Sequence, residues 1–274
     1  MMVEALVYFF VPALVGVLIG IASGLLGIGG GTVMVPIFRL AFGMSATMST
    51  ATSLFAIIPT SISGAISHVK GKTCIPALGI AAGLGGACLS PVGVWLAQLS
   101  PDWLVMLAAA LIIGYSAINM FKKAFKLRPA GQPAAGVDAA APTADDSSLS
   151  RKQLLQGAAI GLVAGLASGY VGVGGGFIMV PLMLSIIGIP MRKASGTSLI
   201  AVMILAIPGV IEQGIIRNIN YLAGIAIVIG TIPGAVIGAR LVTKVPERTL
   251  RLLFGCFLIV AAVMLVLNEV GIFG

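Results

Sequence analysis

Charged residues are scarce in this chain of 274 residues, and this scarcity excludes a water-soluble fold. Asp, Glu, Lys and Arg make up 9% of the sequence, hydrophobic residues make up 59%, and the mean hydropathy is +1.14. A surface that faces water needs far more polar side chains than this. No segment alternates between apolar and polar residues as the strands of a membrane barrel do. We therefore expect an all-α integral membrane protein.

Histidine, cysteine and acidic residues are also few, which excludes most catalytic and metal-binding sites. One histidine and eight acidic residues cannot supply a Ser/His/Asp triad, a Cys/His pair or a metal cluster. We therefore expect no enzyme activity, no cofactor and no metal. The cysteines Cys74, Cys88 and Cys256 lie far apart without CxxC spacing, and we expect them to be small packing residues. The net charge of +8 is interpreted as a topology signal, and no nucleic acid partner is expected.

Apolar stretches of membrane length are abundant. Six of them reach the roughly 20 residues that a helix needs to cross about 30 Å of hydrocarbon. They cover residues 3–24, 46–67, 75–98, 103–120, 219–239 and 250–267. Two shorter apolar elements, 32–42 and 177–187, would rise only about 16 Å as helices, so we predict that they are half-helices.

The chain repeats itself at a fixed shift of 145 residues. Residues 23–31, SGLLGIGGG, return at 168–176 as SGYVGVGGG, and the similarity continues downstream in both copies. A duplicated hydrophobic unit broken by glycine is typical of secondary transporters, which bind substrate between two halves. We predict one membrane repeat over residues 1–123 and a second over 151–274, each with five apolar elements broken by half-helices. Transport is therefore the leading hypothesis.

Basic residues near the middle of the chain predict its orientation. Residues 124–150 are rich in Ala, Pro, Asp and Ser, lack apolar periodicity and are predicted to be a flexible linker. The basic residues around its ends are Lys122, Lys123, Lys126, Arg128, Arg151 and Lys152. By the positive-inside rule the linker is cytoplasmic, and both chain ends, which lack Lys and Arg, lie on the periplasmic or extracellular side. Each half then crosses the bilayer five times, or three times with a re-entrant hairpin, and the two repeats have inverted topology.

The glycine runs of the two repeats are the strongest candidates for a binding site. Glycine-rich backbone exposes N–H groups, which are tolerated at membrane depth only where they face protein or a polar cavity. If half-helices begin at Thr32 and Phe177, their free N–H groups and positive dipole ends form an anion site without a charged side chain. The alternative is a tight hairpin that serves packing alone. Neither run continues into the Gly-Lys-Ser/Thr of a nucleotide-binding loop.

Hydroxyl groups recur at the repeat shift near the start of a later helix in each half. In lipid such hydroxyls most often bond to their own helix or a neighbour, but their recurrence favours contact with substrate. We assign substrate binding to Gly29, Gly30, Gly31, Thr32, Thr52, Ser53, Gly174, Gly175, Gly176, Phe177, Thr197 and Ser198. We assign helix breaking to Gly27, Pro36, Gly172 and Pro181.

Two further patterns concern packing and protons. Glycines spaced four residues apart predict close helix contacts at Gly16, Gly20 and Gly24 and at Gly161, Gly165 and Gly169. An ionisable residue inside a membrane is a functional candidate, so His68 and Glu212 are assigned to possible proton coupling. The alternatives are a solvated helix end for His68 and a paired structural carboxylate for Glu212.

The doubled signature Gly-x-Gly-Gly-Gly, followed five residues later by Pro36 or Pro181, resembles the TauE/SafE family of bacterial membrane transporters, the sulfite exporter family. The resemblance covers both repeats and omits the linker. It implies a permease of the bacterial inner membrane for a small sulfur-containing anion such as sulfite, thiosulfate, sulfoacetate or another organosulfonate. The expected partners are this small anionic substrate and the lipid bilayer.

The expected mechanism is alternating access, in which one half rocks about a central anion site, with possible proton coupling. The alternatives are an anion channel and a transporter of small carboxylates. A membrane-embedded enzyme and an assembly factor are the rivals from other classes. The identity of the anion, the direction of transport, the coupling ion and the oligomeric state do not follow from the sequence.

Overall fold

Helices make up the regular structure in the computed structural model of this chain, which describes residues 2–126 and 150–269. They are α1 (Met2–Leu26), α2 (Gly31–Phe42), α3 (Ala46–Lys70), α4 (Pro76–Leu99), α5 (Asp102–Lys126), α6 (Arg151–Val171), α7 (Gly176–Leu182) with its π-helical continuation η2 (Met183–Ile187), α8 (Met191–Ile215), α9 (Tyr221–Leu241) and α10 (Glu247–Glu269). No strand occurs in these described ranges, which confirms the all-α prediction. Helix α5 extends three residues into the predicted linker, and residues 127–149 lie outside the described residues.

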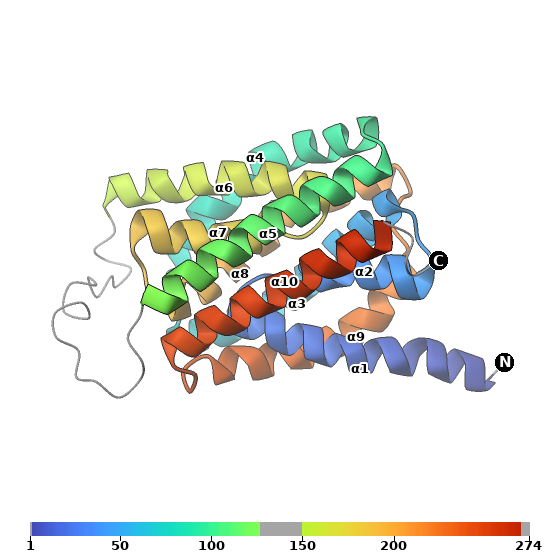
Figure 1. Cartoon of the computed structure of the whole chain (residues 1–274), viewed down its shortest axis with the longest axis horizontal. Helices are drawn as coiled ribbons and strands as arrows, with labels where there is room; N and C mark the ends of the chain where they lie inside the picture. Colours follow the sequence, from blue (N-terminus) through green and yellow to red (C-terminus); the bar gives the residue numbers. More distant parts are fainter. Residues whose placement is uncertain (1, 127–149, 270–274) are drawn as a thin grey trace.

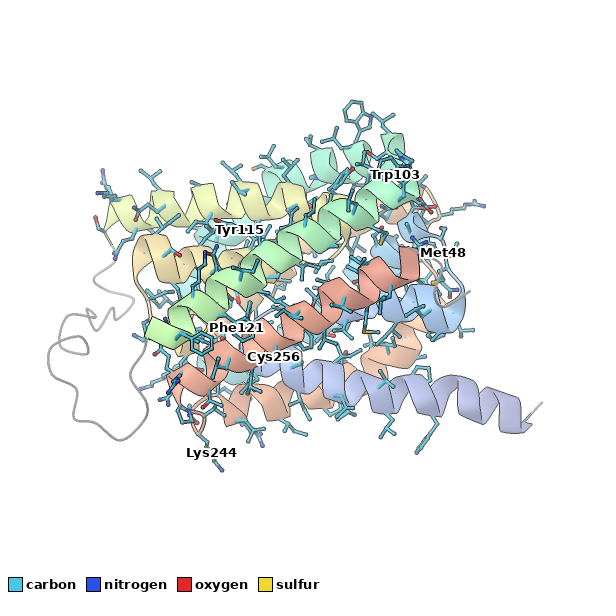
Figure 2. All side chains as sticks on the ribbon, in the orientation of Figure 1. Met48, Trp103, Tyr115, Phe121, Lys244 and Cys256 are labelled. Carbon is cyan, nitrogen blue, oxygen red and sulfur yellow. The ribbon has the colours of Figure 1, made fainter. Side chains whose placement is uncertain are left out.

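Seven helices within the described residues are long and apolar enough to cross a membrane, namely α3, α4, α5, α6, α8, α9 and α10. Helix α1 is also 25 residues long. The outer face formed by α5 and α10 carries projecting side chains such as Tyr115 (Figure 2), and many of the exposed side chains on these helices are apolar. A surface of this composition faces lipid, which is as apolar as a leucine side chain.

The cysteines correct one expectation. Cys88 and Cys256 are exposed on the helix surface, so the prediction that they are packing residues is wrong for these two (Figure 2 labels Cys256). The physical reason is that the lipid-facing surface and the core of a membrane protein are equally apolar. A small apolar residue therefore does not reveal on which side of its helix it lies.

The two short elements are short helices that begin at the glycine runs. Helix α2 has 12 residues, and α7 has 7 residues before it widens into the 5-residue π-helical turn η2. Twelve helical residues rise about 18 Å, well short of the bilayer core. Each starts one residue earlier than predicted, at Gly31 and at Gly176. The prediction of two short helices is confirmed, and Pro36 and Pro181 lie inside them.

Helices of one repeat pack mainly on helices of the other. Helix α1 lies along α9 and α4 lies along α6, while α3 crosses α8 and α5 lies beside α10 (Figure 1). The 145-residue shift converts α1 into α6 and α4 into α9, so the first two pairs are the same contact seen from each half. The two repeats are therefore interwoven into one core and are not two separate bundles.

Glycine makes these paired helices approach backbone to backbone. A Cβ on Gly20 would overlap the carbonyl oxygen of Thr231 in α9, and a Cβ on the equivalent Gly165 would overlap the carbonyl oxygen of Gly86 in α4. Gly16, Gly24, Gly161 and Gly169 make the corresponding contacts one turn away. The close packing predicted from the four-residue spacing is confirmed.

The two ends of the described chain lie at one end of the bundle, and the two helices that flank residues 127–149 meet that gap at the opposite end (Figure 1). Helix α5 ends and α6 begins at one end, whereas α1 begins and α10 ends at the other (Figure 1). Helices α1 and α6 also run in opposite directions (Figure 1). Two inverted repeats require this arrangement, and their orientation in a membrane stays a prediction.

Candidate functional site

The two glycine runs form loops that face each other in the core. One connects α1 to α2 and the other connects α6 to α7, and all their residues are buried. A Cβ on Gly31 would lie 2.7 Å from the carbonyl carbon of Val173, and a Cβ on Gly176 would lie 2.8 Å from the Cα of Ile28. Segments separated by 145 residues in sequence are thus in direct contact.

The loops share one backbone conformation that requires glycine. Gly29 and Gly30 have φ angles of 73° and 85°, and the equivalent Gly174 and Gly175 have φ angles of 85° and 66°. An L-residue with a side chain rarely adopts such left-handed values, whereas glycine does so freely. The helix-breaking residues Gly27 and Gly172 are left-handed too, with φ of 76° and 72°. The repeated glycines therefore encode the same chain turn twice.

The first loop leaves a run of backbone donors free. The N–H groups of Val33 and Met34 bond to the carbonyl oxygen of Gly30 at 3.3 Å and 3.2 Å, as in the first turn of a helix. The N–H groups of residues 28–32 make no hydrogen bond to any described part of the chain. The equivalent loop resembles it, although Gly176 N–H bonds to Gly174 O at 2.8 Å. Free donors at the start of α2 form the positive end of a helix dipole.

Buried hydroxyl groups without partners accompany the loops. Within the described residues, seven buried hydroxyls have no hydrogen-bond partner: Ser23, Thr32, Ser49, Ser53, Ser61, Ser90 and Ser168. A Cβ on Gly29 would lie 3.4 Å from Ser61 Oγ, and one on Gly30 would lie 3.6 Å from Ser23 Cβ. Buried polar groups are nearly always paired, so each exception calls for an explanation.

Several of these hydroxyls lie outside the predicted set, although a signal for two of them was present. Ser23 and Ser168 occupy the first position of the repeated nine-residue motif, so their recurrence could have identified them. Ser61 and Ser90 align with Ala206 and Ala235 across the repeat and left no such signal. Ser61 comes close to the first loop through the packing of α3, whereas Ser90 on α4 lies beside Gly169 and Gly209.

The predicted hydroxyls fall into two groups. Thr52 and Thr197 accept hydrogen bonds from the N–H groups of Asn220 and Ile75, at 3.0 Å and 2.9 Å, and so fix the loops before α9 and α4. Ser198 donates to the carbonyl oxygen of Gly27 at 2.6 Å, whereas its counterpart Ser53 has no partner among the described residues. Ser198 therefore holds the first glycine loop, whereas Ser53 and Thr32 keep buried hydroxyls without a partner among the described residues.

An apolar pair fills the space between the loops. A Cβ on Gly29 would lie 2.9 Å from Val202 Cγ1, and one on Gly174 would lie 2.9 Å from Ile57 Cδ1. Ile57 and Val202 are equivalent across the repeat, fully buried and located on α3 and α8. Phe177, the residue at the position of Thr32 in the second half, is fully buried as well. Side chains therefore close the space between the two glycine loops in this structure.

His68 is fully buried, so it is not a solvated helix end. Its Nδ1 lies 2.7 Å from Thr73 Oγ1, and its Nε2 lies 2.8 Å from the carbonyl oxygen of Gly24. A carbonyl only accepts, so Nε2 carries a proton and donates it to Gly24. His68 thus ties the end of α3 to the last turn of α1, three residues before Gly27.

Glu212 lies near the end of α8 and is only partly buried. Its Oε2 atom is buried without a partner among the described residues. This missing partner gives no support, within the described residues, to the alternative that Glu212 is a paired structural carboxylate. In the described ranges, no three His, Cys, Asp or Glu side chains come together as a metal site would require.

Comparison with known proteins places this architecture in a family. The probable membrane transporter protein YunE of Bacillus subtilis is 27% identical over 97% of this chain and 99% of its own length. The probable membrane transporter protein YdhB of the same organism is 28% identical over 87% of this chain and 92% of its own. A probable membrane transporter protein of Haemophilus influenzae is 28% identical over 93% and 97%, respectively.

No solved structure matches the chain. The family model described as sulfite exporter TauE/SafE matches residues 12–265, which include both glycine loops and every described helix except the ends of α1 and α10. The multi-pass membrane fold, the duplicated loops and this match agree with one another. The chain belongs to the TauE/SafE sulfite exporter family of membrane transporters.

Proposed function

We propose that this protein moves a small sulfur-containing anion, such as sulfite, thiosulfate, sulfoacetate or another organosulfonate, across the bacterial inner membrane as a secondary transporter. The observation that carries the proposal is the coincidence of free backbone N–H groups and unpartnered buried hydroxyls at two facing helix breaks. Oxyanions with several oxygens present acceptors in several directions, and donors from two opposed loops can surround them. The family match supports the same substrate class.

The donors in this site are neutral, and this suits a transporter. Backbone N–H groups at the start of a helix bind anions without a cationic side chain. An arginine clamp would bind more tightly, because charge-assisted bidentate bonds are roughly twice as strong as neutral ones. A site that binds the anion with backbone N–H groups, such as those of Gly31 and Thr32, and with uncharged hydroxyls can therefore release its cargo.

The proposed mechanism is alternating access. In the closed arrangement Ile57 and Val202 fill the space between the loops, so α3 and α8 must separate at their crossing to admit an anion. The inverted halves would rock about this crossing, with the linker in the cytoplasm and both termini outside. His68 and Glu212 are assigned to proton coupling. If an imposed pH gradient does not change the rate of uptake, that assignment is wrong.

Transport into vesicles tests the proposal. Purified protein in phosphatidylcholine vesicles should take up radiolabelled sulfite, thiosulfate or sulfoacetate with saturation, and acetate should compete weakly. Non-saturating flux would indicate a channel, and preference for acetate would indicate a carboxylate transporter. Thr32→Val and Ser23→Ala should each raise KM about tenfold, which corresponds to about 1.4 kcal/mol of lost binding.

The control is Ser116→Ala, which removes a buried hydroxyl from α5, outside the loops. It should leave KM within twofold of the original value. Normal KM in both Thr32→Val and Ser23→Ala would show that the free hydroxyls do not touch the anion. Substitution of Gly30 or Gly175 is a poor test, because their left-handed backbone makes any side chain a folding defect.

A further inference from the structure

A groove of about 560 Å³ opens between the ends of α3 and α9, away from the glycine loops. Its polar lining is Ser63, Ser67, Lys70, Thr73, Arg240 and Thr243. The volume lies within the range of about 300–1,000 Å³ that is usual for small-molecule pockets. No acidic residue lines it. The proposed function does not yet use this groove.

Two cations on opposite walls dominate the charge of the groove. Lys70 ends α3, Arg240 lies in the last turn of α9, and both are exposed. Neither forms an ion pair with a carboxylate in the described part of the chain. The hydroxyls are already engaged, since Ser63 donates to Ile232 O at 2.9 Å and Ser67 donates to Ser63 O at 3.2 Å. The attraction for an anion therefore comes from Lys70 and Arg240.

A continuous set of polar contacts leads from the groove to the first glycine loop. Thr73, which lines the groove, lies 2.7 Å from His68 Nδ1, and His68 Nε2 donates to Gly24 O at 2.8 Å. Ala239, also in the lining, packs against the same turn of α1, since a Cβ on Gly24 would lie 2.8 Å from its nitrogen. Two residues of the groove lining, Thr73 and Ala239, thus connect the groove to the last turn of α1 before the glycine loop, Thr73 through His68 and Ala239 by direct packing.

The groove between α3 and α9 has no basic counterpart at the equivalent place between α8 and α4. The 145-residue shift replaces Lys70 with Ile215 and Arg240 with Trp95. It also replaces Ser67 with Glu212, so an acidic residue stands where the groove has a hydroxyl. Duplication alone would have produced two similar grooves. The cationic pair is therefore present at the groove between α3 and α9 and absent from the equivalent place between α8 and α4.

The groove lies at the end of the bundle where α5 ends and α6 begins. The loop after α9 carries Lys244, which Figure 2 shows at this same end. Because this loop and the linker ends are basic, the end is predicted to be cytoplasmic. We propose that the groove is an oxyanion vestibule, in which Lys70 and Arg240 collect the transported anion from water before it passes His68 to the glycine loops. This inference rests on the proposed function.

A lipid phosphate has the same chemistry as a free oxyanion, so the test must separate the two sources. The full chain is reconstituted in phosphatidylcholine vesicles, and initial uptake of radiolabelled sulfite, thiosulfate and sulfoacetate is measured for Lys70→Ala, Arg240→Ala and Lys244→Ala. Lys244 is an exposed cation at the same end that does not line the groove, which makes it the matched control. The measurement is then repeated in vesicles that contain phosphatidylglycerol.

We expect Lys70→Ala and Arg240→Ala to raise KM about five- to tenfold with maximal rates within twofold, whereas Lys244→Ala changes KM less than twofold. Lys70→Arg should restore the original KM. Thermal unfolding should be unchanged, because the two cations have no partner in the described chain.

Three results would contradict the vestibule. If the original protein transports but both groove variants behave like Lys244→Ala, the groove is not on the anion's route. If the variants change KM only when phosphatidylglycerol is present, the groove binds a lipid phosphate instead. If the original protein takes up none of the three anions, the proposed function itself fails, and the vestibule fails with it.

Discussion

At the scale of single residues, this protein keeps hydrogen-bond donors free where a core built for stability would pair them. A buried hydroxyl without a partner destabilises a fold by about 1–3 kcal/mol. Ser23 and Ser168 are equivalent across the repeat, fully buried and unpartnered in the described chain. The same unsatisfied state in both halves leaves these two hydroxyls without a stabilising role in the described chain, as the proposed anion site requires.

Ser53 and Ser198 provide a direct test, since they are equivalent positions with different bonding. Ser198→Ala removes the bond to Gly27 O and should lower the free energy of unfolding by about 1 kcal/mol. Ser53→Ala removes only an unpartnered group, so it should leave stability unchanged or raise it while KM for the anion increases. Thermal unfolding and uptake kinetics of the two variants measure both effects. Equal loss of stability in both would mean that Ser53 has a structural partner.

The residues of the site could be predicted only where the repeat made them visible. The glycines and Ser23 recur in a fixed motif, and a left-handed turn leaves few other residue types possible. The acceptor roles of Thr52 and Thr197 could not be predicted, because they depend on N–H groups 168 and 122 residues away. The burial of His68 likewise depends on Gly24, which the chain brings close only in the folded state.

At the scale of helices, the lengths of the apolar stretches predict where the helices lie. Which helices pack against each other is decided by the tertiary structure. Four-residue glycine spacing indicates that α1 and α6 pack closely but not against which helix, since any small-residue face would fit. The structure pairs α1 with α9 and α6 with α4. The starts of α3 and α8 are also held across the chain, where Ala46 and Met191 N–H groups each donate to a carboxylate, of Asp102 and Glu247, at 3.2 Å.

Glycine-to-alanine substitutions should separate close helix contacts from free helix surface. In α5, Gly114 has nothing within 4 Å of a new Cβ, so Gly114→Ala should stabilise by about 0.5–1 kcal/mol through helix propensity. In α1, Gly20→Ala places its Cβ against the Thr231 carbonyl, so it should destabilise by about 1–3 kcal/mol despite the same propensity gain. Thermal unfolding of the two variants gives the comparison. Similar midpoints for both would mean that α1 and α9 separate easily.

At the scale of the whole molecule, the repeat places the start of α1 and the end of α10 at one end of an interwoven bundle, and the end of α5 and the start of α6 at the other (Figure 1). Exposed Trp103 stands at the start of α5, and Lys244 follows α9 at the opposite end (Figure 2). Trp is enriched at membrane interfaces and Lys at the cytoplasmic side. Because each repeat contacts the other along its length, a rocking motion must change contacts in both halves together.

The orientation can be tested with a membrane-impermeant maleimide in a background without Cys74, Cys88 and Cys256. In this background, Lys244→Cys should be labelled in inside-out vesicles but not in intact cells, and Trp103→Cys should show the reverse pattern. The reason is that an odd number of crossings separates the two positions, which lie at opposite ends of the bundle. Labelling of both positions from one side would rule out inverted repeats. Exchange of the two patterns would keep the repeats inverted but move the basic groove to the outside, so the anion would be collected there.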